Sequence, residues 1–392
     1  MRILVIAAVL MALAIPGWST AHPFPHAGKY ANGIRPTAAP DSMNQAALYA
    51  YYLWSDNYIT NEGCPQGAYR VQRAEAYNYD TVSEGIGWGM LITVLMDNQQ
   101  TDTRRYFDGF WQYYQSHLNK HGLMAWKIAR SGKAEFSEAA TEADQNVALA
   151  LLFASKQWGN GGRFNYLSEA GQLISKIFSS EVEAKSFVLK PGADWGGFNA
   201  TNPGYFAPAY YRIFAQFDDN WLKVADRCYK IYDIFYDRYA TGLFPDWTVA
   251  DGSISYRSNN FTYDACQAPL KISLDYLWNG QGEKYLQKIN YWLVQETRSD
   301  PAAIVDGYTL DGAPIGKYHN AAFVGPLTVS AMVADKYQTW LDMLYDHLVR
   351  MDSGGKWGYY QDTLRLVSLL ILSGNFPNLW EAAPEPQEWL KS

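Results

Sequence analysis

The 392-residue sequence has little cysteine, fewer basic than acidic residues, and none of the short motifs of several common enzyme classes. Its three cysteines, Cys64, Cys228 and Cys266, allow at most one disulfide bond, and their spacing matches no zinc site. The net charge of −7 disfavours binding to nucleic acid or to an anionic membrane surface. The motifs Gly-x-Ser-x-Gly and His-Glu-x-x-His are absent, and no cofactor motif is present. We therefore expect no catalytic metal and no cofactor.

Long apolar runs are also missing, except at the N-terminus. Arg2 precedes an unbroken apolar run over 3–13, which is too short to span a bilayer, and Ser19 and Ala21 form a small-x-small cleavage pattern. We predict a signal peptide over 1–21 and a mature protein that is secreted or periplasmic, without a membrane segment.

The rest of the chain favours one large helical domain. Residues 22–41 are rich in Pro, Gly and Ala and predict an extended N-terminal arm. Residues 42–392 contain no long Ser/Pro linker and no tandem repeat, so we predict a single domain. Helical periodicity recurs in this domain at 42–59, 84–96, 103–119, 142–158, 165–180, 204–217, 219–238, 263–278, 281–297, 319–334, 336–351 and 358–374.

About twelve helices in one domain predict an all-α fold in which six helical hairpins close into a ring. Alternate helices would be inner and outer, and the longer linkers can hold small β pieces. The even-numbered helices begin with polar and aromatic residues, at 83–85, 141–144, 202–205, 263–265, 319–320 and 359–360. Ordinary helix capping explains some of these residues. It does not explain why a tyrosine lies beside the polar residue at several of the starts, and we expect a cleft where these starts meet.

The aromatic content indicates what such a cleft would bind. Tryptophan and tyrosine total 45 residues against 17 phenylalanines. Most of these rings belong in a core, but Trp and Tyr combine an apolar face with a polar edge, which suits a half-wet carbohydrate site.

Acidic residues at three of the helix starts fit the hydrolysis of a glycosidic bond, which needs a proton donor and a second carboxylate. Glu84 is flanked by glycines and aromatic rings and is our candidate acid, although it could simply complement the helix dipole. Asp264 is our candidate base, although an aspartate there could be an N-cap. Glu142 and Asp144 point in different directions from one helix, so that one can face the cleft while the other caps.

The residues around these acids resemble glycoside hydrolase family 8, and most closely its clostridial-type secreted endoglucanases. Residues 78–85 look like the acid motif of that family, and 140–144 with Ala148, Ala154 and Trp158 look like its signature. Further matching segments follow in the family's order at 202–211, 242–247, 304–309, 364–366 and 373–377.

The resemblance implies an (α/α)6 barrel and an inverting endo-β-1,4-glucanase with Glu84 as acid and Asp264 as base. Inversion implies carboxyl groups roughly 6.5–9.5 Å apart, with a water molecule between them. The resemblance also implies a β-1,4-glucan or cello-oligosaccharide partner, and we expect a monomer. The rings that it places along the sugar are Trp126, Trp195, Tyr205, Tyr263, Tyr359 and Tyr360.

Two residues depart from the family pattern. Glu142 stands where the family has aspartate at the position that holds the distorted sugar, and its extra methylene could misplace the carboxylate. Gln267 stands where this branch usually has arginine, so a cation on the leaving-group side is lost. The alternatives are therefore a β-1,4-xylanase on the same scaffold, or a glucan-binding protein with weakened catalysis. A role in cellulose synthesis rather than digestion also remains open.

Overall fold

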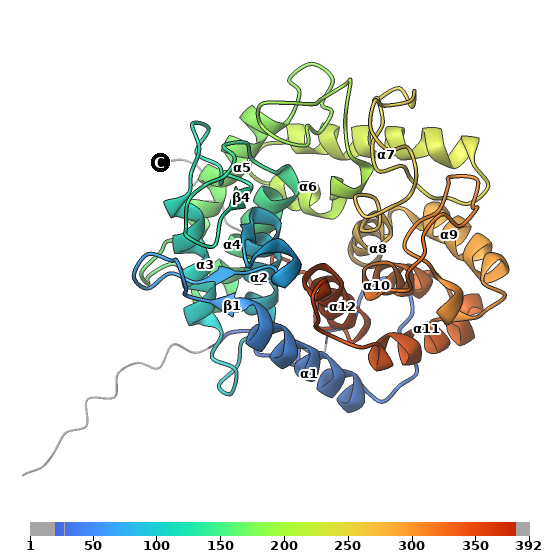
Figure 1. Ribbon diagram of the computed structural model, residues 1–392, viewed down its shortest axis with the longest axis horizontal. Coiled ribbons are helices and arrows are strands. Elements are labelled where there is room, and N and C mark those ends of the chain that lie inside the picture. Colours follow the sequence, from blue (N-terminus) through green and yellow to red (C-terminus); the bar gives the residue numbers. More distant parts are fainter. Residues whose placement is uncertain (1–19, 27, 382–392) are drawn as a thin grey trace, which may run out of the picture.

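The computed structural model describes residues 20–26 and 28–381, and in this part of the chain twelve α-helices form a closed double ring (Figure 1). The predicted signal peptide lies outside the described residues, apart from its last two positions. The outer helices are α1 (Pro40–Tyr58), α3 (Arg104–Ser116), α5 (Tyr166–Glu181), α7 (Asn220–Arg238), α9 (Glu283–Glu296) and α11 (Gln338–Arg350). The inner helices are α2 (Ser83–Leu95), α4 (Thr141–Trp158), α6 (Pro208–Phe214), α8 (Ala268–Asn279), α10 (Ala321–Ser330) and α12 (Gly358–Leu372).

Burial separates the two rings and confirms the predicted (α/α)6 arrangement. The outer helix α3 buries Phe107, Phe110, Trp111 and Tyr114, which is a single stripe at helical spacing. The inner helix α2 buries every residue except Glu84, because protein surrounds it on all sides. None of the helices in the described part of the chain is both long enough and apolar enough to cross a membrane.

Two inner helices begin later than their sequence pattern predicts. The expected helix over 204–217 is a short 3₁₀ turn at Pro203–Tyr205 followed by α6, and the expected helix over 263–278 begins only at Ala268. Both helices carry proline in the first turn, at Pro208 and Pro269. Proline suits the first turn of a helix, and Pro208 disfavours helical backbone in Ala207 before it. At α8 the N-cap is Gln267, three residues after Asp264. Asp264 is therefore not the N-cap of α8.

The N-terminal arm crosses the end of the barrel where the inner helices finish. Its backbone amides donate hydrogen bonds to the carbonyls of Asp97, Leu277 and Met332, which lie at or just after the ends of α2, α8 and α10. The Tyr30 hydroxyl donates to the carbonyl of Ile371 near the end of α12 at 2.9 Å. The arm therefore satisfies carbonyl groups that helix ends leave open.

Small β pieces occur in the linkers, as expected. β1 (Ile59–Thr60) pairs antiparallel with β2 (Arg70–Val71), and β3 (Thr81–Val82) pairs with β4 (Lys127–Ile128). The three cysteines are all free thiols. The second ribbon leads directly into α2 and fixes where that helix begins.

Close contact between α2 and α4 gives a stability prediction. A Cβ atom at Gly87 would lie 2.9 Å from the carbonyl oxygen of Ala143 and 2.9 Å from Cβ of Asn146. We expect Gly87→Ala to lower the free energy of unfolding by about 1–3 kcal/mol through overpacking, measured by chemical denaturation. Gly161→Ala is the matched control, because a Cβ there meets no atom within 4 Å. Equal stability of the two variants would contradict the proposed tight helix contact.

Candidate active site

A cleft of about 900 Å³ opens where the inner helices begin, at the end of the barrel opposite the arm. It brings together nine of the predicted site residues: Glu84, Trp126, Glu142, Tyr205, Tyr263, Asp264, Gln267, Tyr359 and Tyr360. Asp144 and Trp195 are not among the lining residues. The cleft therefore gathers side chains that lie far apart in the sequence and come from α2, α4, α8, α12 and their preceding loops.

Glu84 lies in the first turn of α2 and points into the cleft. The Tyr359 hydroxyl donates a hydrogen bond to its Oε1 at 3.0 Å. Burial raises the pKa of Glu84 to about 7, although Tyr359 and the positive charge of Arg73 act in the opposite direction. A carboxyl group with this pKa holds a proton near neutral pH and can give it to a leaving group.

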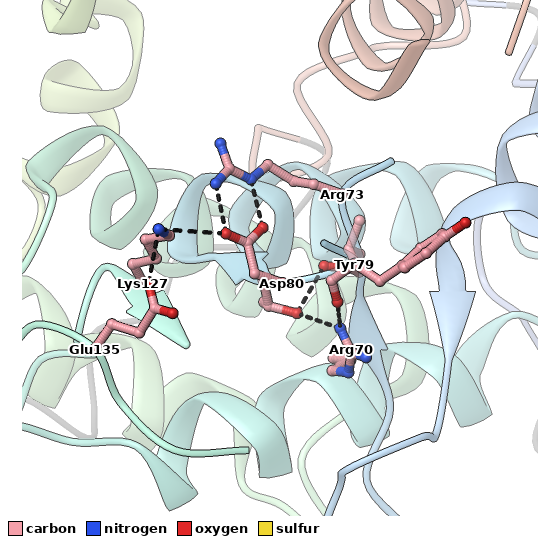
Figure 2. Close-up of polar contacts among 8 residues, drawn as sticks. Arg70, Arg73, Tyr79, Asp80, Lys127 and Glu135 are labelled. Carbon is pink, nitrogen blue, oxygen red and sulfur yellow. Dashed lines mark hydrogen bonds and ion pairs between the residues drawn. The ribbon is translucent and has the colours of Figure 1, made fainter. Parts of the chain in front are cut away.

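The segment before Glu84 is fixed by a second, non-cleft carboxylate (Figure 2). Asp80 accepts two hydrogen bonds from Arg73, at 2.7 and 2.6 Å, and lies 3.6 Å from Nζ of Lys127 on β4. The Arg70 guanidinium donates to the carbonyl of Tyr79 at 2.7 Å. These contacts hold the turn before β3, and they place Arg73 on the cleft wall.

Asp264 lies on an irregular turn that is exposed to the open cleft. The indole N–H of Trp247 donates to its Oδ2 at 2.8 Å. Burial by the surrounding residues raises the pKa of Asp264, while the Trp247 hydrogen bond lowers it. The carboxylate thus has one fixed donor on one oxygen, and its open side can bind a water molecule.

Asp246 builds the turn that carries Asp264. Its Oδ1 accepts hydrogen bonds from the backbone amides of Thr262 and Ala265, and its Oδ2 accepts from the hydroxyls of Ser258 and Thr262. Gly204 packs against the same turn so tightly that a Cβ atom there would lie 2.0 Å from the carbonyl oxygen of Asp264. Any larger residue at position 204 would displace the turn.

The two residues that depart from the family pattern both lie at the cleft floor. Glu142 is 3% exposed, and burial together with the charge of Glu84 raises its pKa to about 8. Its Oε1 has no hydrogen-bond partner among the described residues. The Gln267 amide donates to the hydroxyl of Tyr360 at 2.9 Å and also favours the ionised form of Glu142. Both side chains therefore keep positions from which they can contact a ligand.

Asp144 lies outside the cleft, which corrects its inclusion among the predicted catalytic residues. Two positions along a helix turn the side chain by about 200°, so that Asp144 points away when Glu142 faces the cleft. It is fully buried and accepts a hydrogen bond from the Tyr114 hydroxyl on α3. Burial raises its pKa, and Glu181 of α5 lies beside it. The residue links α4 to two outer helices.

Trp195 does not line the cleft. It packs against Trp247, the residue that contacts the candidate base Asp264. Its ring centroid is 5.3 Å from that of Trp247, which in turn hydrogen-bonds Asp264. The Arg257 guanidinium lies 4.6 Å from each of the two ring centroids. This aromatic pair extends the apolar surface beyond Asp264.

Several cleft residues were not predicted from the sequence. Trp247 occurs in a segment that matches the family, and that context is the signal that could have identified it. Trp357 is 61% exposed and lies edge-on to Tyr77, with 5.5 Å between centroids; its position just before α12 was a usable signal. Arg73 lies in a loop without a local pattern, and its contacts with Asp80 and with the Tyr77 ring place it. Further lining residues are Ser83, Asp306, Tyr318, His319 and Asn320.

The described residues contain no group of three His, Cys, Asp or Glu side chains that could hold a metal ion. Among the carboxyl groups that line the cleft, Glu84 and Asp264 lie in different surroundings. Glu84 is half-buried and accepts a hydrogen bond from the Tyr359 hydroxyl, whereas Asp264 is exposed and accepts one from the Trp247 indole. Two carboxyl groups in such different surroundings are the requirement for acid–base cleavage of a glycosidic bond.

Comparison with known proteins gives a consistent result. The family model for Glycosyl hydrolases family 8 matches residues 22–374. Endoglucanase A of Acetivibrio thermocellus is 39% identical over 96% of this chain and 80% of its own length. Endoglucanase C of Ruminiclostridium cellulolyticum is 38% identical over 94% of this chain and 80% of its own length. The apo structure of a β-1,3-1,4-glucanase from Paenibacillus sp. X4 superimposes with a TM-score of 0.85 at 32% identity, covering 91% of this chain and 99% of that one. The chain belongs to glycosyl hydrolases family 8.

Proposed function

We propose that the protein is an inverting endo-β-1,4-glucanase that cleaves internal bonds of cellulose and related β-glucans. The observation that carries the proposal is the pairing of Glu84, whose pKa is raised to about 7, with an exposed Asp264 in a cleft lined by aromatic rings. Relatives named endoglucanase that are 38–39% identical support the choice of glucan. The leader-like residues 1–21 fit an exported enzyme that meets its polymer outside the cytoplasm.

Each carboxyl group has one step to perform. Glu84 protonates the glycosidic oxygen of the leaving chain as that bond breaks. Asp264 removes a proton from a water molecule, which attacks the anomeric carbon from the opposite face. Trp247 keeps the Asp264 carboxylate oriented, and Tyr359 stabilises the carboxylate that Glu84 becomes. Aromatic faces along the cleft suit the apolar faces of successive sugar rings.

The first test measures reducing-sugar release and loss of viscosity on carboxymethyl-cellulose, mixed-linkage β-glucan and xylan. We expect hydrolysis of the glucans, with viscosity falling faster than reducing ends appear. Glu84→Gln and Asp264→Asn should each lower turnover by about 10²–10⁴-fold while binding of cello-oligosaccharides is kept. Glu296→Gln and Asp56→Asn alter exposed acids that do not line the cleft and are the matched controls.

The outcomes of this test are distinct. Hydrolysis of xylan alone would change the substrate and keep the mechanism. Oligosaccharide binding without any hydrolysis would favour the glucan-binding alternative and would point to Glu142. Substantial residual activity in Glu84→Gln would contradict the acid assignment. Nuclear magnetic resonance of the first product should show the α-anomer, because inversion of a β bond gives that configuration.

The pH profile tests the surroundings of the acid. Glu84 acts in its protonated form, so turnover should fall as pH rises through its pKa of about 7. Tyr359→Phe removes a donor that favours the ionised carboxyl, which raises the pKa of Glu84. We expect the alkaline limb of turnover to move to higher pH. An unchanged limb in a folded Tyr359→Phe protein would assign that limb to another group.

The variant Glu142→Asp tests whether the longer side chain of glutamate lowers turnover. Glu142→Asp shortens the side chain by one methylene and restores the residue type of the family. We expect turnover on glucan to rise, because the shorter carboxylate would hold the distorted sugar in the position that the rest of the cleft provides. Steady-state kinetics measure the change. A fall in turnover would show that the cleft has adapted to glutamate.

A further inference from the structure

A buried lysine lies directly beneath the cleft floor. Three inner helices place a cleft side chain at their starts: Glu84 on α2, Glu142 on α4 and Gln267 at the N-cap of α8. Four residues further along these helices lie Trp88, Asn146 and Lys271. Residues at i and i+4 share a helix face, with a rise of about 5.4 Å per turn. The second set therefore forms a layer one turn below the first.

The ammonium group of Lys271 joins this layer together. Its Nζ donates to Oδ1 of Asn146 at 2.9 Å and lies 4.4 Å from the ring centroid of Trp88. It also lies 3.4 Å from the hydroxyl of Tyr210 and 4.8 Å from the centroid of that ring. Contacts to α2, α4 and α6 thus place a positive charge at the centre of the inner ring.

This cation has no direct anionic partner. Lys271 is 1% exposed, and none of the ion pairs among the described residues includes it. A buried ammonium group is costly unless nearby charges offset its lost hydration. Its contacts are a neutral amide, a phenol hydroxyl and two ring faces. Burial lowers the pKa of Lys271 to about 8, and the carboxyl groups of Glu142 and Glu84, one turn above, act in the opposite direction.

We propose that Lys271 is a positioning residue for the acid step, whose buried ammonium group stabilises the carboxylate that Glu84 becomes when it gives up its proton. The inference rests on the proposed function, in which Glu84 is the acid. Fixed charges that act where charge develops lower a barrier most effectively when they are buried and already in place. With a neutral amide at position 267, Lys271 supplies the positive charge beneath the floor.

Lys271 is one of several groups around Glu84 that affect its pKa. Arg73 and Lys271 favour its ionised form, as does the Tyr359 hydroxyl, whereas burial and Asp264 favour its protonated form. Lys271 also favours ionisation of Glu142, whose own charge is coupled to that of Glu84. Loss of the ammonium group should therefore raise the proton affinity of both carboxyl groups and make Glu84 a weaker acid.

The test compares Lys271→Met, which keeps the length and removes the charge, with Lys271→Arg, which keeps the charge. We expect Lys271→Met to move the alkaline limb of kcat to higher pH. The same variant should lower kcat at neutral pH by roughly tenfold or more with little change in KM. Lys271→Arg should keep the wild-type limb. Thermal unfolding reports whether each variant is folded, and Lys271→Gln replaces Lys271→Met if the latter does not fold.

A second measurement separates this inference from the proposed function. Titration of the ¹³C-labelled Glu84 carboxyl by nuclear magnetic resonance reports its pKa whether or not the protein hydrolyses glucan. A higher pKa in Lys271→Met than in the wild type and Lys271→Arg supports the proposal. An unchanged pKa in a folded Lys271→Met protein, or an equal rise in both variants, overturns it.

Discussion

Burial of the inner helices on every side is the constraint on which the site depends. Functional groups on these helices can reach solvent only at the helix ends, and the N-terminal arm covers the C-terminal ends. The N-terminal ends then form the cleft, where helix dipoles favour negative charge and burial disfavours it. At Glu84 burial has the larger effect, because the pKa is raised. The architecture of the barrel thus raises the pKa of Glu84, so that this carboxyl group can act as a proton donor.

The acid and the base are held by different means. Glu84 is fixed by a helix, whereas Asp264 sits on a turn without regular structure. Two further aspartates support them: Asp80 binds the side chain of Arg73 on the acid side, and Asp246 accepts hydrogen bonds from backbone amides on the base side. Neither of these aspartates lines the cleft. The proposed reaction uses the carboxyl groups of Glu84 and Asp264. Two other carboxylates, Asp80 and Asp246, help to fix the positions of these two groups.

The sequence predicts the ring of helices well because the outer helices have one apolar face, the inner helices are apolar on nearly all sides, and the total number of helices is even. It predicts Glu84, Glu142 and Asp264 as cleft residues because the first two occupy helix starts within motifs and the third lies in a motif just before a helix. It fails where position depends on contacts between distant segments. Arg73 reaches the cleft through Asp80, Asp144 turns toward α3, and α8 begins only at Ala268, so that Asp264 lies on the preceding turn. These outcomes follow from side-chain direction and tertiary packing, which a local pattern does not contain.

Glu142 and Gln267 are best understood as a coupled pair. The family pattern would place a short carboxylate and a cation at these positions, and this chain has a longer carboxylate and a neutral amide. The amide favours the ionised form of Glu142, so the two side chains still interact across the floor. Without a cation at 267, however, burial and Glu84 leave the Glu142 carboxyl with a raised pKa. The electrostatic balance of the floor then depends on charges held elsewhere, on Arg73 at the wall and Lys271 beneath. Restoring the family residue at only one of the two positions would change that balance, and the effects of the two substitutions should therefore not add.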